Sequence, residues 1–175
     1  YGGKTVEVDR FSRYVQRIIE LPVGYDASKI TTAIRADDGE HVPTQVYQKD
    51  GKYYAKINSL TNSTYALIYN QQSFADASGK WYAAAADEMA SRCVIFGRSN
   101  GKFDGEANVT RAEFAAMIVR ALGLPETGDS NFSDVSGTAW CAGAIGAASE
   151  YGIIYGYTDG SFRPNQNITR QEAMA

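Results

Sequence analysis

Apolar and polar side chains alternate along the first seventy residues of the chain. The alternating runs are Val6 and Val8; Tyr53, Ala55 and Ile57; and Tyr65, Leu67 and Tyr69. A period of two residues places one face of a β-strand in a core. Turn-forming residues at 22–24, 37–39 and 50–51 separate the apolar runs. The pattern predicts a small all-β, sandwich-like domain over residues 1–70. We expect the chain to be cut from a longer protein, so earlier strands of this sandwich can be missing.

From Phe74 onward the apolar period changes to that of a helix. Trp81, Ala84, Ala85 and Met89 would share one face of a first helix, and Phe114, Met117, Ile118, Ala121 and Leu122 would share one face of a second. This spacing of three and four residues is typical of an amphipathic helix. The second half is therefore predicted to be mainly helical from about residue 80, and the fold class to be α+β with more than one domain.

The helical half contains the same pattern twice. The offset is 58 for Phe74/Phe132 and Asp76/Asp134, and 59 for Trp81/Trp140, Gly101/Gly160, Phe103/Phe162, Thr110/Thr169, Arg111/Arg170 and Glu113/Glu172. A duplicated unit of this length predicts two helix-loop-helix repeats, at residues 74–127 and 132–175. Ala175 aligns with Ala116, so the second repeat is truncated in its last helix. We expect the protein to continue into a third unit.

Composition and charge exclude several classes of protein. A net charge of -3 argues against a binder of nucleic acid or of anionic membranes, because both rest on clustered positive charge. No apolar run is long enough to cross a bilayer, so no membrane insertion is expected. Two cysteines, Cys93 and Cys141, and the single His41 leave little material for a metal site, and no cofactor is expected. Buried thiols are favoured for the two cysteines, with a disulfide between them as the alternative.

Each repeat contains a Thr-Arg-x-Glu sequence that fits a helix capping box. In this motif Thr110 or Thr169 accepts a hydrogen bond from the third helical residue, and Glu113 or Glu172 reaches back. The arginine is unexplained, because a cation opposes the positive end of the helix dipole. One explanation is an external anion that takes free backbone N–H groups and the guanidinium. The other is an internal partner such as Asp76 or Asp134.

Two further features bear on function. Trp81 and Trp140 open the first helix of each repeat, where they would either fill a core between the repeats or offer a flat face to a sugar ring. No arrangement of Ser, His and Asp, no Cys/His pair and no phosphate-binding loop is present, so the chain is not expected to be an enzyme.

The ordered motifs Phe-x-Asp, Trp, Gly-x-Phe and Val/Ile-Thr-Arg-x-Glu, found twice between Phe74 and Ala175, resemble the S-layer homology (SLH) domain family. The resemblance implies attachment of a surface protein to the cell wall through a secondary wall polysaccharide that often carries pyruvate. It also implies that three repeats form a prism with glycan-binding grooves. On this chain the glycan-binding positions fall on Arg111, Arg170, Trp81, Trp140, Asp76, Asp134, Gly101 and Gly160. The arginines would meet the pyruvyl carboxylate.

The repeats depart from the family pattern at two places. The proline of the family's Phe-x-Pro turn is Pro164 in the second repeat but Gly105 in the first, and Gln171 stands where the first repeat has Ala112.

The sequence thus predicts a cell-wall anchor located outside the cell, in the wall or S-layer of a bacterium. Its partner would be a pyruvylated wall polysaccharide, with self-association through the repeats as a further expectation. Two alternatives stay open. The repeats are a structural or assembly module without glycan binding, or they are the anchor region of a larger wall-processing enzyme whose catalytic domain lies elsewhere.

Overall fold

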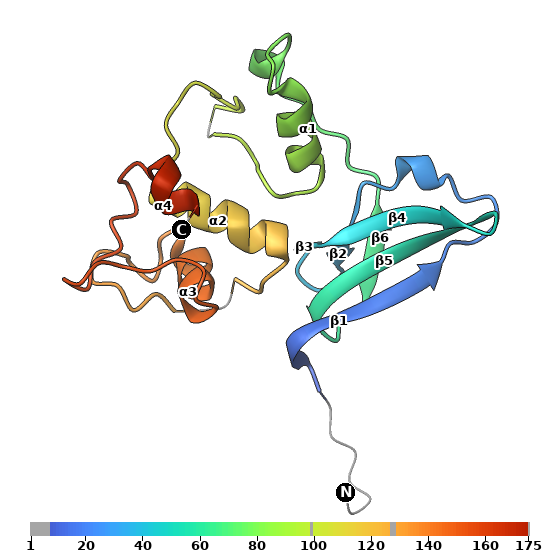
Figure 1. Cartoon of the computed structure of the whole chain (residues 1–175), viewed down its shortest axis with the longest axis horizontal. Coiled ribbons are helices and arrows are strands. Elements are labelled where there is room, and N and C mark those ends of the chain that lie inside the picture. Colours follow the sequence, from blue (N-terminus) through green and yellow to red (C-terminus); the bar gives the residue numbers. More distant parts are fainter. Residues whose placement is uncertain (1–7, 99, 127–128, 175) are drawn as a thin grey trace, which may run out of the picture. The chain divides into compact units, whose positions relative to one another are not determined.

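The computed structural model describes residues 8–98, 100–126 and 129–174 of the chain. By its internal contacts the chain divides into two compact units, residues 1–71 and 72–175. The first contains all strands of the described residues and the second contains all their α-helices, so the chain mixes α and β structure in consecutive blocks (Figure 1).

The strand unit consists of two three-stranded antiparallel sheets. One has the order β1-β5-β4 and the other β3-β2-β6. The strands are β1 (Arg10–Glu20), β2 (Thr32–Arg35), β3 (His41–Val42), β4 (Thr44–Lys49), β5 (Lys52–Thr61) and β6 (Tyr65–Ile68), with a short 3-10 helix η1 (Ala27–Lys29) between β1 and β2.

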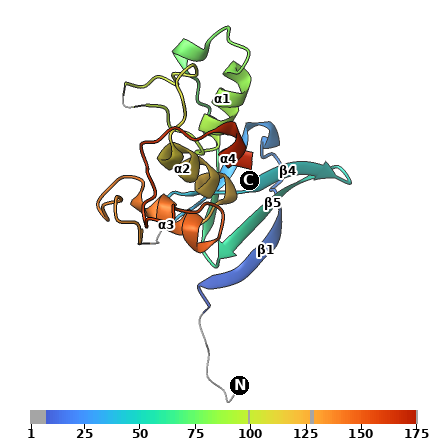
Figure 2. The same ribbon diagram turned by 60° about the vertical axis from the view of Figure 1, so that its left-hand side comes forward.

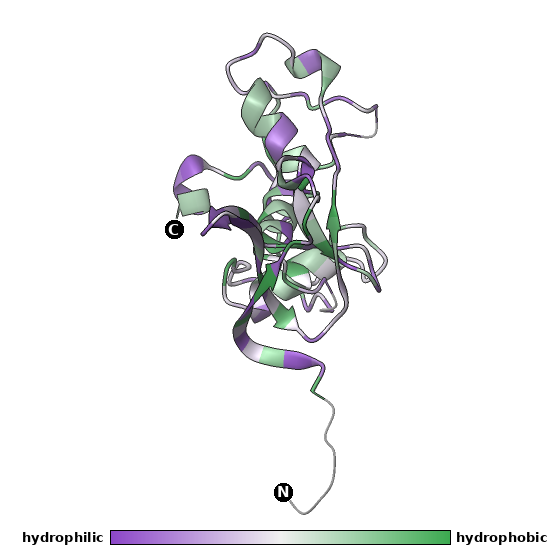
Figure 3. Ribbon diagram, turned by 90° about the vertical axis from the view of Figure 1, so that its right-hand side faces the viewer, coloured by the Kyte–Doolittle hydropathy of each residue, from purple (hydrophilic) through white to green (hydrophobic). Residues whose placement is uncertain are grey.

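The core of the strand unit joins the two sheets. Ile57 of β5 packs with Ala33 of β2 and Val42 of β3, and all three are fully buried. The strands of this unit carry both hydrophobic and hydrophilic residues in Figure 3, as a sheet with one buried face requires. The alternation identified the core side of β5 and β6, because Ala55 and Ile57 are buried and Tyr65 and Leu67 pack against the core. Two of the alternating residues, Tyr53 and Tyr69, are exposed instead.

The hairpin between β4 and β5 follows from its turn residues. Asp50 and Gly51 both have positive φ, at 50° and 76°. Two consecutive residues of this kind form the tight turn whose twist matches that of antiparallel strands. The predicted turn at 50–51 is confirmed.

The start of the chain differs from the sequence expectation. Val8 lies before β1 and outside any strand, while Val6 lies outside the described residues. The first described strand is instead β1, which begins at Arg10 and pairs with β5 through a register shift between Arg10 and Val15. Arg13 and Arg17 interrupt the apolar pattern of β1, which is why alternation alone did not find this strand.

Among its described residues the helical unit contains one short 3-10 helix and four α-helices. The first repeat has η2 (Ala75–Ala77), α1 (Ala83–Ser91) and α2 (Arg111–Leu122), and the second has α3 (Ala142–Glu150) and α4 (Arg170–Met174). Helices α2 and α3 pack against each other, and Figure 2 shows them side by side. The second helix of the first repeat therefore meets the first helix of the second repeat.

The predicted apolar faces of α1 and α2 are wrong in phase. In α1 the buried residues are Ala86, Ala90 and Ser91, whereas Ala84, Ala85 and Met89 are exposed. In α2 the fully buried alanines and valine lie one or two positions away from the predicted stripe, at Ala112, Ala115, Ala116 and Val119. Small alanines let helices approach closely, so the contact face follows alanine rather than the largest apolar side chains.

Candidate functional site

The two repeats build the same loop in the same way. Asp76 accepts hydrogen bonds from the backbone N–H groups of Phe103 and Asp104, at 3.1 and 2.9 Å. Asp134 accepts them from Phe162 and Arg163, at 2.7 and 2.8 Å. The carboxylate at the start of each repeat therefore holds the loop that leads to its last helix.

These hydrogen bonds favour the ionised carboxylates. The backbone N–H groups of Asp104 and Phe103 hold the pKa of Asp76 below its ordinary value. Burial raises the pKa of Asp134, but the N–H groups of Phe162 and Arg163 outweigh this, and the pKa is lowered. Both side chains thus have a structural task in the loop, whatever else they contact.

Gly101 and Gly160 occupy the tip of the same loop. Their φ angles are +74° and +80°, a region that side chains other than glycine rarely adopt, and a Cβ at either position would meet no atom within 4 Å. The turn requires glycine here for backbone conformation, and the surface around it is open.

Trp81 and Trp140 are exposed, at 93% and 64% of their surface. Trp81 touches the ring of Tyr82 edge-on, with centroids 5.5 Å apart. The alternative in which the tryptophans fill a core between the repeats is therefore wrong. A large apolar ring that is left in water at the same place in two repeats is available to a ligand.

Both capping boxes form. The Thr110 hydroxyl accepts from the Glu113 N–H at 3.2 Å, and the Glu113 carboxylate accepts from the Thr110 N–H at 2.8 Å. Thr169 and Glu172 repeat the arrangement at 3.1 and 2.8 Å. The Thr and Glu of each Thr-Arg-x-Glu sequence are thus accounted for by the start of a helix.

The N-terminus of α2 has no free backbone donors for an external anion. The N–H of Arg111 donates to the carbonyl of Gln166 at 2.8 Å, and the N–H of Ala112 donates to the carbonyl of Pro164 at 3.0 Å. The next N–H belongs to the capping box. Carbonyl groups of the second repeat therefore accept from the backbone N–H groups that, in the external-anion interpretation, would have bound the anion.

The Arg111 side chain is directed into the second repeat as well. Its Nε donates to the carbonyl of Phe162 at 2.9 Å and its Nη2 to that of Tyr155 at 2.7 Å. The guanidinium lies between the rings of Tyr157 and Phe162, 4.9 and 4.8 Å from their centroids, and its Nη1 is 3.7 Å from Glu172. Only 6% of the side chain is exposed.

The structure supports the second explanation for Arg111, in which the guanidinium has partners inside the protein. The partners are neither Asp76 nor Asp134, as the sequence had suggested, but two carbonyl oxygens, two aromatic rings and the Glu172 carboxylate of the second repeat. Buried guanidinium groups need such partners for their N–H donors. The sequence analysis did not identify Tyr155 and Tyr157, which contact the Arg111 side chain. The alignment of the repeats offers a signal for Tyr157, because the aligned residue of the first repeat is the cationic Arg98.

Arg98 fills the equivalent space in the first repeat. Its Nη1 lies 3.1 Å from Glu113 and its Nη2 donates to the carbonyl of Asn108 at 3.4 Å. The first repeat thus neutralises its capping glutamate with an arginine of its own loop. The second repeat places an aromatic ring there and receives Arg111 from the preceding repeat.

Arg170, the counterpart of Arg111, is exposed at the start of α4. The nearby Arg163 stacks on Tyr157 at 3.9 Å and pairs with Asp159 at 3.0 Å. The two repeat arginines thus differ in burial: Arg111 is buried in the helical unit, and Arg170 is exposed.

The two cysteines do not form a disulfide in the structure. Cys93 and Cys141 are both free thiols, and burial raises the pKa of Cys141. Within residues 8–98, 100–126 and 129–174, no three His, Cys, Asp or Glu side chains are grouped so that they could hold a metal ion. No helix in this part of the chain is long and apolar enough to cross a membrane.

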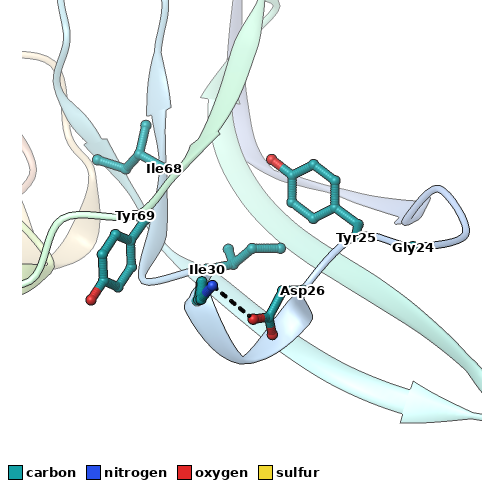
Figure 4. A pocket seen from close by; sticks show the side chains of 7 residues that line it. Gly24, Tyr25, Asp26, Ile30, Ile68 and Tyr69 are labelled. Atoms are coloured by element: carbon teal, nitrogen blue, oxygen red, sulfur yellow. Dashed lines mark ion pairs between the residues drawn. The ribbon is translucent and has the colours of Figure 1, made fainter.

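A cavity of about 260 Å³ lies in the strand unit, and none of the predicted glycan-binding residues is part of its wall (Figure 4). Ile30 and Ile68 are part of its wall, together with Tyr25, Tyr69 and Asp26. The Asp26 carboxylate accepts from the Ser28 N–H at 3.2 Å and pairs with Lys29 at 3.3 Å, so it caps η1.

The helical unit is thus a pair of helix-loop-helix repeats, joined by an arginine of the first and carrying two exposed tryptophans. Residues 73–115 and 131–174 match the model of the S-layer homology domain. The chain belongs to the S-layer homology domain family through these two segments.

Several curated relatives share this region. The chain is 40% identical over 121 residues to an amylopullulanase of Thermoanaerobacterium thermosulfurigenes, covering 68% of the chain and 6% of that protein. It is 40% identical over 115 residues to endo-1,4-beta-xylanase A of Thermoanaerobacterium saccharolyticum, covering 65% and 10%. It is 30% identical over 157 residues to a surface layer protein of Brevibacillus choshinensis, covering 80% and 14%. The chain therefore spans only a small part of each of these relatives.

Proposed function

We propose that this chain anchors a protein to the bacterial cell wall by binding a wall polysaccharide through its two S-layer homology repeats. The family match supports anchoring, and the relatives named as surface layer proteins support a place outside the cell, in the wall. The share of large relatives that the chain covers fits a module that serves a longer protein.

The exposed pair Trp81 and Trp140 carries the proposal. Both occur at the same position of the repeat, shortly before the first helix, and both residues are exposed. Indole rings stack on the apolar face of a sugar ring and can donate one hydrogen bond through Nε1. Two such rings on one unit suit a polymer with a repeating sugar.

The remaining site residues divide into ligand contacts and loop supports. Arg170 is exposed and is proposed to meet a carboxylate of the polymer, such as a ketal-linked pyruvate, with a charge-assisted hydrogen bond. Asp76, Asp134, Gly101 and Gly160 are proposed to shape the loops beside the tryptophans. Arg111 is proposed to hold the loop of the second repeat in the binding conformation rather than to touch the glycan.

The finer domain division belongs to the same proposal. Residues 1–70 would form a sandwich-like domain that precedes the repeats, and residues 74–127 and 132–175 would be the two repeats. The separation into compact units near residue 71 supports this division.

Co-sedimentation with cell-wall sacculi of Brevibacillus choshinensis tests the proposal. We expect the chain to sediment with sacculi that retain their polysaccharide and to stay in solution with sacculi stripped by hydrofluoric acid. The double variant Trp81→Ala/Trp140→Ala should bind about tenfold more weakly, because two stacking contacts are lost. Tyr25→Ala, which removes a half-exposed ring of the strand unit, is the matched control and should bind as the parent does. Equal sedimentation of the double variant and the parent would contradict the proposal.

The names of the enzyme relatives favour one second possibility. The amylopullulanase and the xylanase match over a region of the size of the repeats, so the chain can be the anchor region of a larger wall-associated enzyme. The anchoring role of the repeats is the same in that case. A purely structural module is the outcome in which sacculi with and without polysaccharide retain the chain equally.

A further inference from the structure

The sheet β1-β5-β4 has a second face, opposite to its core, that none of the functions above uses. On β5 the core-facing residues Ala55 and Ile57 alternate with residues of the outer face, and the strand registers assign the neighbours on β1 and β4. The outer face consists of Gln16, Ile18 and Glu20 of β1, Lys52, Tyr54, Lys56 and Asn58 of β5, and Gln45, Tyr47 and Lys49 of β4. The three strands lie side by side in Figure 1.

Two tyrosines occupy the middle of this outer face. Tyr47 and Tyr54 are directly opposite each other in the register, and their rings stack with centroids 5.6 Å apart and planes at 23°. Both rings are half-buried by neighbours on the same face, and they contribute nothing to the core between the sheets. A nearly parallel ring pair on a sheet forms a flat apolar platform with two hydroxyl groups at its edge.

Amide side chains flank the tyrosine pair. Gln16 donates to Asn58 at 3.4 Å, and Gln45 lies opposite Lys56 on the next strand. Amide groups beside an aromatic platform can accept and donate hydrogen bonds to neighbouring hydroxyl groups at the same time. This combination suits sugars better than it suits a protein partner, because the centre of a protein interface is more apolar than a face on which Ile18 is the one aliphatic residue.

The charge of the outer face is positive on an acidic chain. Lys49, Lys52 and Lys56 stand against the single carboxylate of Glu20, which pairs with Lys52 at 2.8 Å. By contrast, residues 72–175 contain eight Lys and Arg but twelve Asp and Glu. A local excess of ammonium groups, in a protein of net charge -3, complements an anionic ligand.

We propose that the outer face of the sheet β1-β5-β4 is a second binding site for an anionic polysaccharide. The sugar rings stack on Tyr47 and Tyr54, and the lysines pair with carboxylate or phosphate groups of the polymer. The choice of a wall polysaccharide as the source of this ligand rests on the proposed function of the repeats. Two contacts from one chain to one polymer raise its retention without tightening either contact, since the second contact forms at high effective concentration.

Calorimetric titration of the full chain with polysaccharide released from Brevibacillus choshinensis sacculi tests this inference. Lys56→Glu should weaken binding about fivefold, because it replaces an attraction by a repulsion at an exposed site. Lys29→Glu makes the same charge change outside the outer face and should alter the affinity less than twofold. Tyr47→Ser should weaken binding while Tyr47→Phe keeps the parent affinity, provided both melt as the parent does.

The outcomes separate this inference from the function of the repeats. Parent affinity in Lys56→Glu together with loss in Trp81→Ala/Trp140→Ala overturns the sheet site and leaves the repeats as the anchor. Loss in Lys56→Glu with parent affinity in the tryptophan variant supports the sheet site and contradicts the repeat site. If Lys56→Glu also lowers retention on stripped sacculi to the same extent, the face binds another wall component and the polysaccharide assignment is wrong.

Discussion

At the scale of single residues, the same sequence position has two different tasks in the two repeats. Arg111 is enclosed by the loop of the second repeat, whereas Arg170 faces solvent. The dipole cost of an arginine in the first helical turn is thus offset at Arg111 by carbonyl acceptors and aromatic faces. The two arginines therefore have different surroundings in the structure, although the sequence motif around them is the same.

Arg111→Ala should destabilise the helical unit by about 3 kcal/mol, because the buried carbonyl of Phe162 and the partly buried carbonyl of Tyr155 both lose a charged donor. Arg170→Ala, the matched change at an exposed site, should stay within about 0.5 kcal/mol of the parent. Urea unfolding followed by circular dichroism measures both. Equal stability of the two variants would show that the guanidinium contacts of Arg111 contribute nothing.

Acid should destabilise the protein through the loop carboxylates. The folded pKa values of Asp76 and Asp134 lie below the ordinary value, and hydrogen bonds from Ser161 lower the pKa of Asp159 to about 2. Stability from such groups is present above the unfolded pKa of about 4 and is lost as the pH falls through the folded pKa. We expect the melting temperature to drop between about pH 4 and pH 2.

Asp134→Asn gives this acid effect its control. The variant should melt below the parent at pH 7, because the amide offers one acceptor oxygen instead of two. It should lose less than the parent between about pH 4 and pH 2, since one titrating group is gone. Calorimetric scans at both pH values measure the difference, and parallel curves for the two proteins would remove Asp134 from the explanation.

At the scale of elements, a large residue before the first helix accompanies a small residue in the loop of the first repeat, and the second repeat has the reverse. The first repeat has Tyr82 and Gly105, and the second has Cys141 and Pro164 at the aligned positions. A Cβ at Gly105 would lie 2.6 Å from Cε2 of Tyr82, so a side chain does not fit there. The departure from the family's Phe-x-Pro turn therefore compensates for a large ring at Tyr82.

Gly105→Pro should cost about 1–3 kcal/mol through this overlap. The residue before the substitution is compatible with proline, because Asp104 and Arg163 both have φ 59° and Arg163 already precedes Pro164. In a Tyr82→Cys background the same substitution should cost less than about 0.5 kcal/mol. A double-mutant cycle by urea unfolding measures the coupling, and strict additivity would contradict this compensation.

At the scale of the whole molecule, charge gives no general attraction to an anionic wall. The chain has a net charge of -3, so binding must come from local contacts. Raising the salt concentration from low to physiological strength should weaken polysaccharide binding less than tenfold, because only a few ion pairs form and much of the contact is stacking on aromatic rings, which salt does not screen. Removing pyruvate from the polysaccharide should weaken binding more. Calorimetry with matched polymers measures both changes, and equal affinity for the two polymers would exclude a carboxylate contact of Arg170.

The sequence predicted the parts of this molecule that depend on local chemistry. Period two found β5 and β6, and the capping boxes at Thr110 and Thr169 follow from four consecutive residues. The phase of α1 and α2 and the direction of the Arg111 side chain could not be predicted in this way, because both depend on which segment packs against them. Glycan contacts stay predictions, since they depend on a molecule outside the chain.

The two repeats depend on each other unequally, as the contacts of Arg98 and Arg111 show. The first repeat completes its own loop, while the second needs a residue that precedes it by about fifty positions. The loop of the second repeat therefore depends on a side chain of the first repeat, whereas the loop of the first repeat pairs with residues of its own.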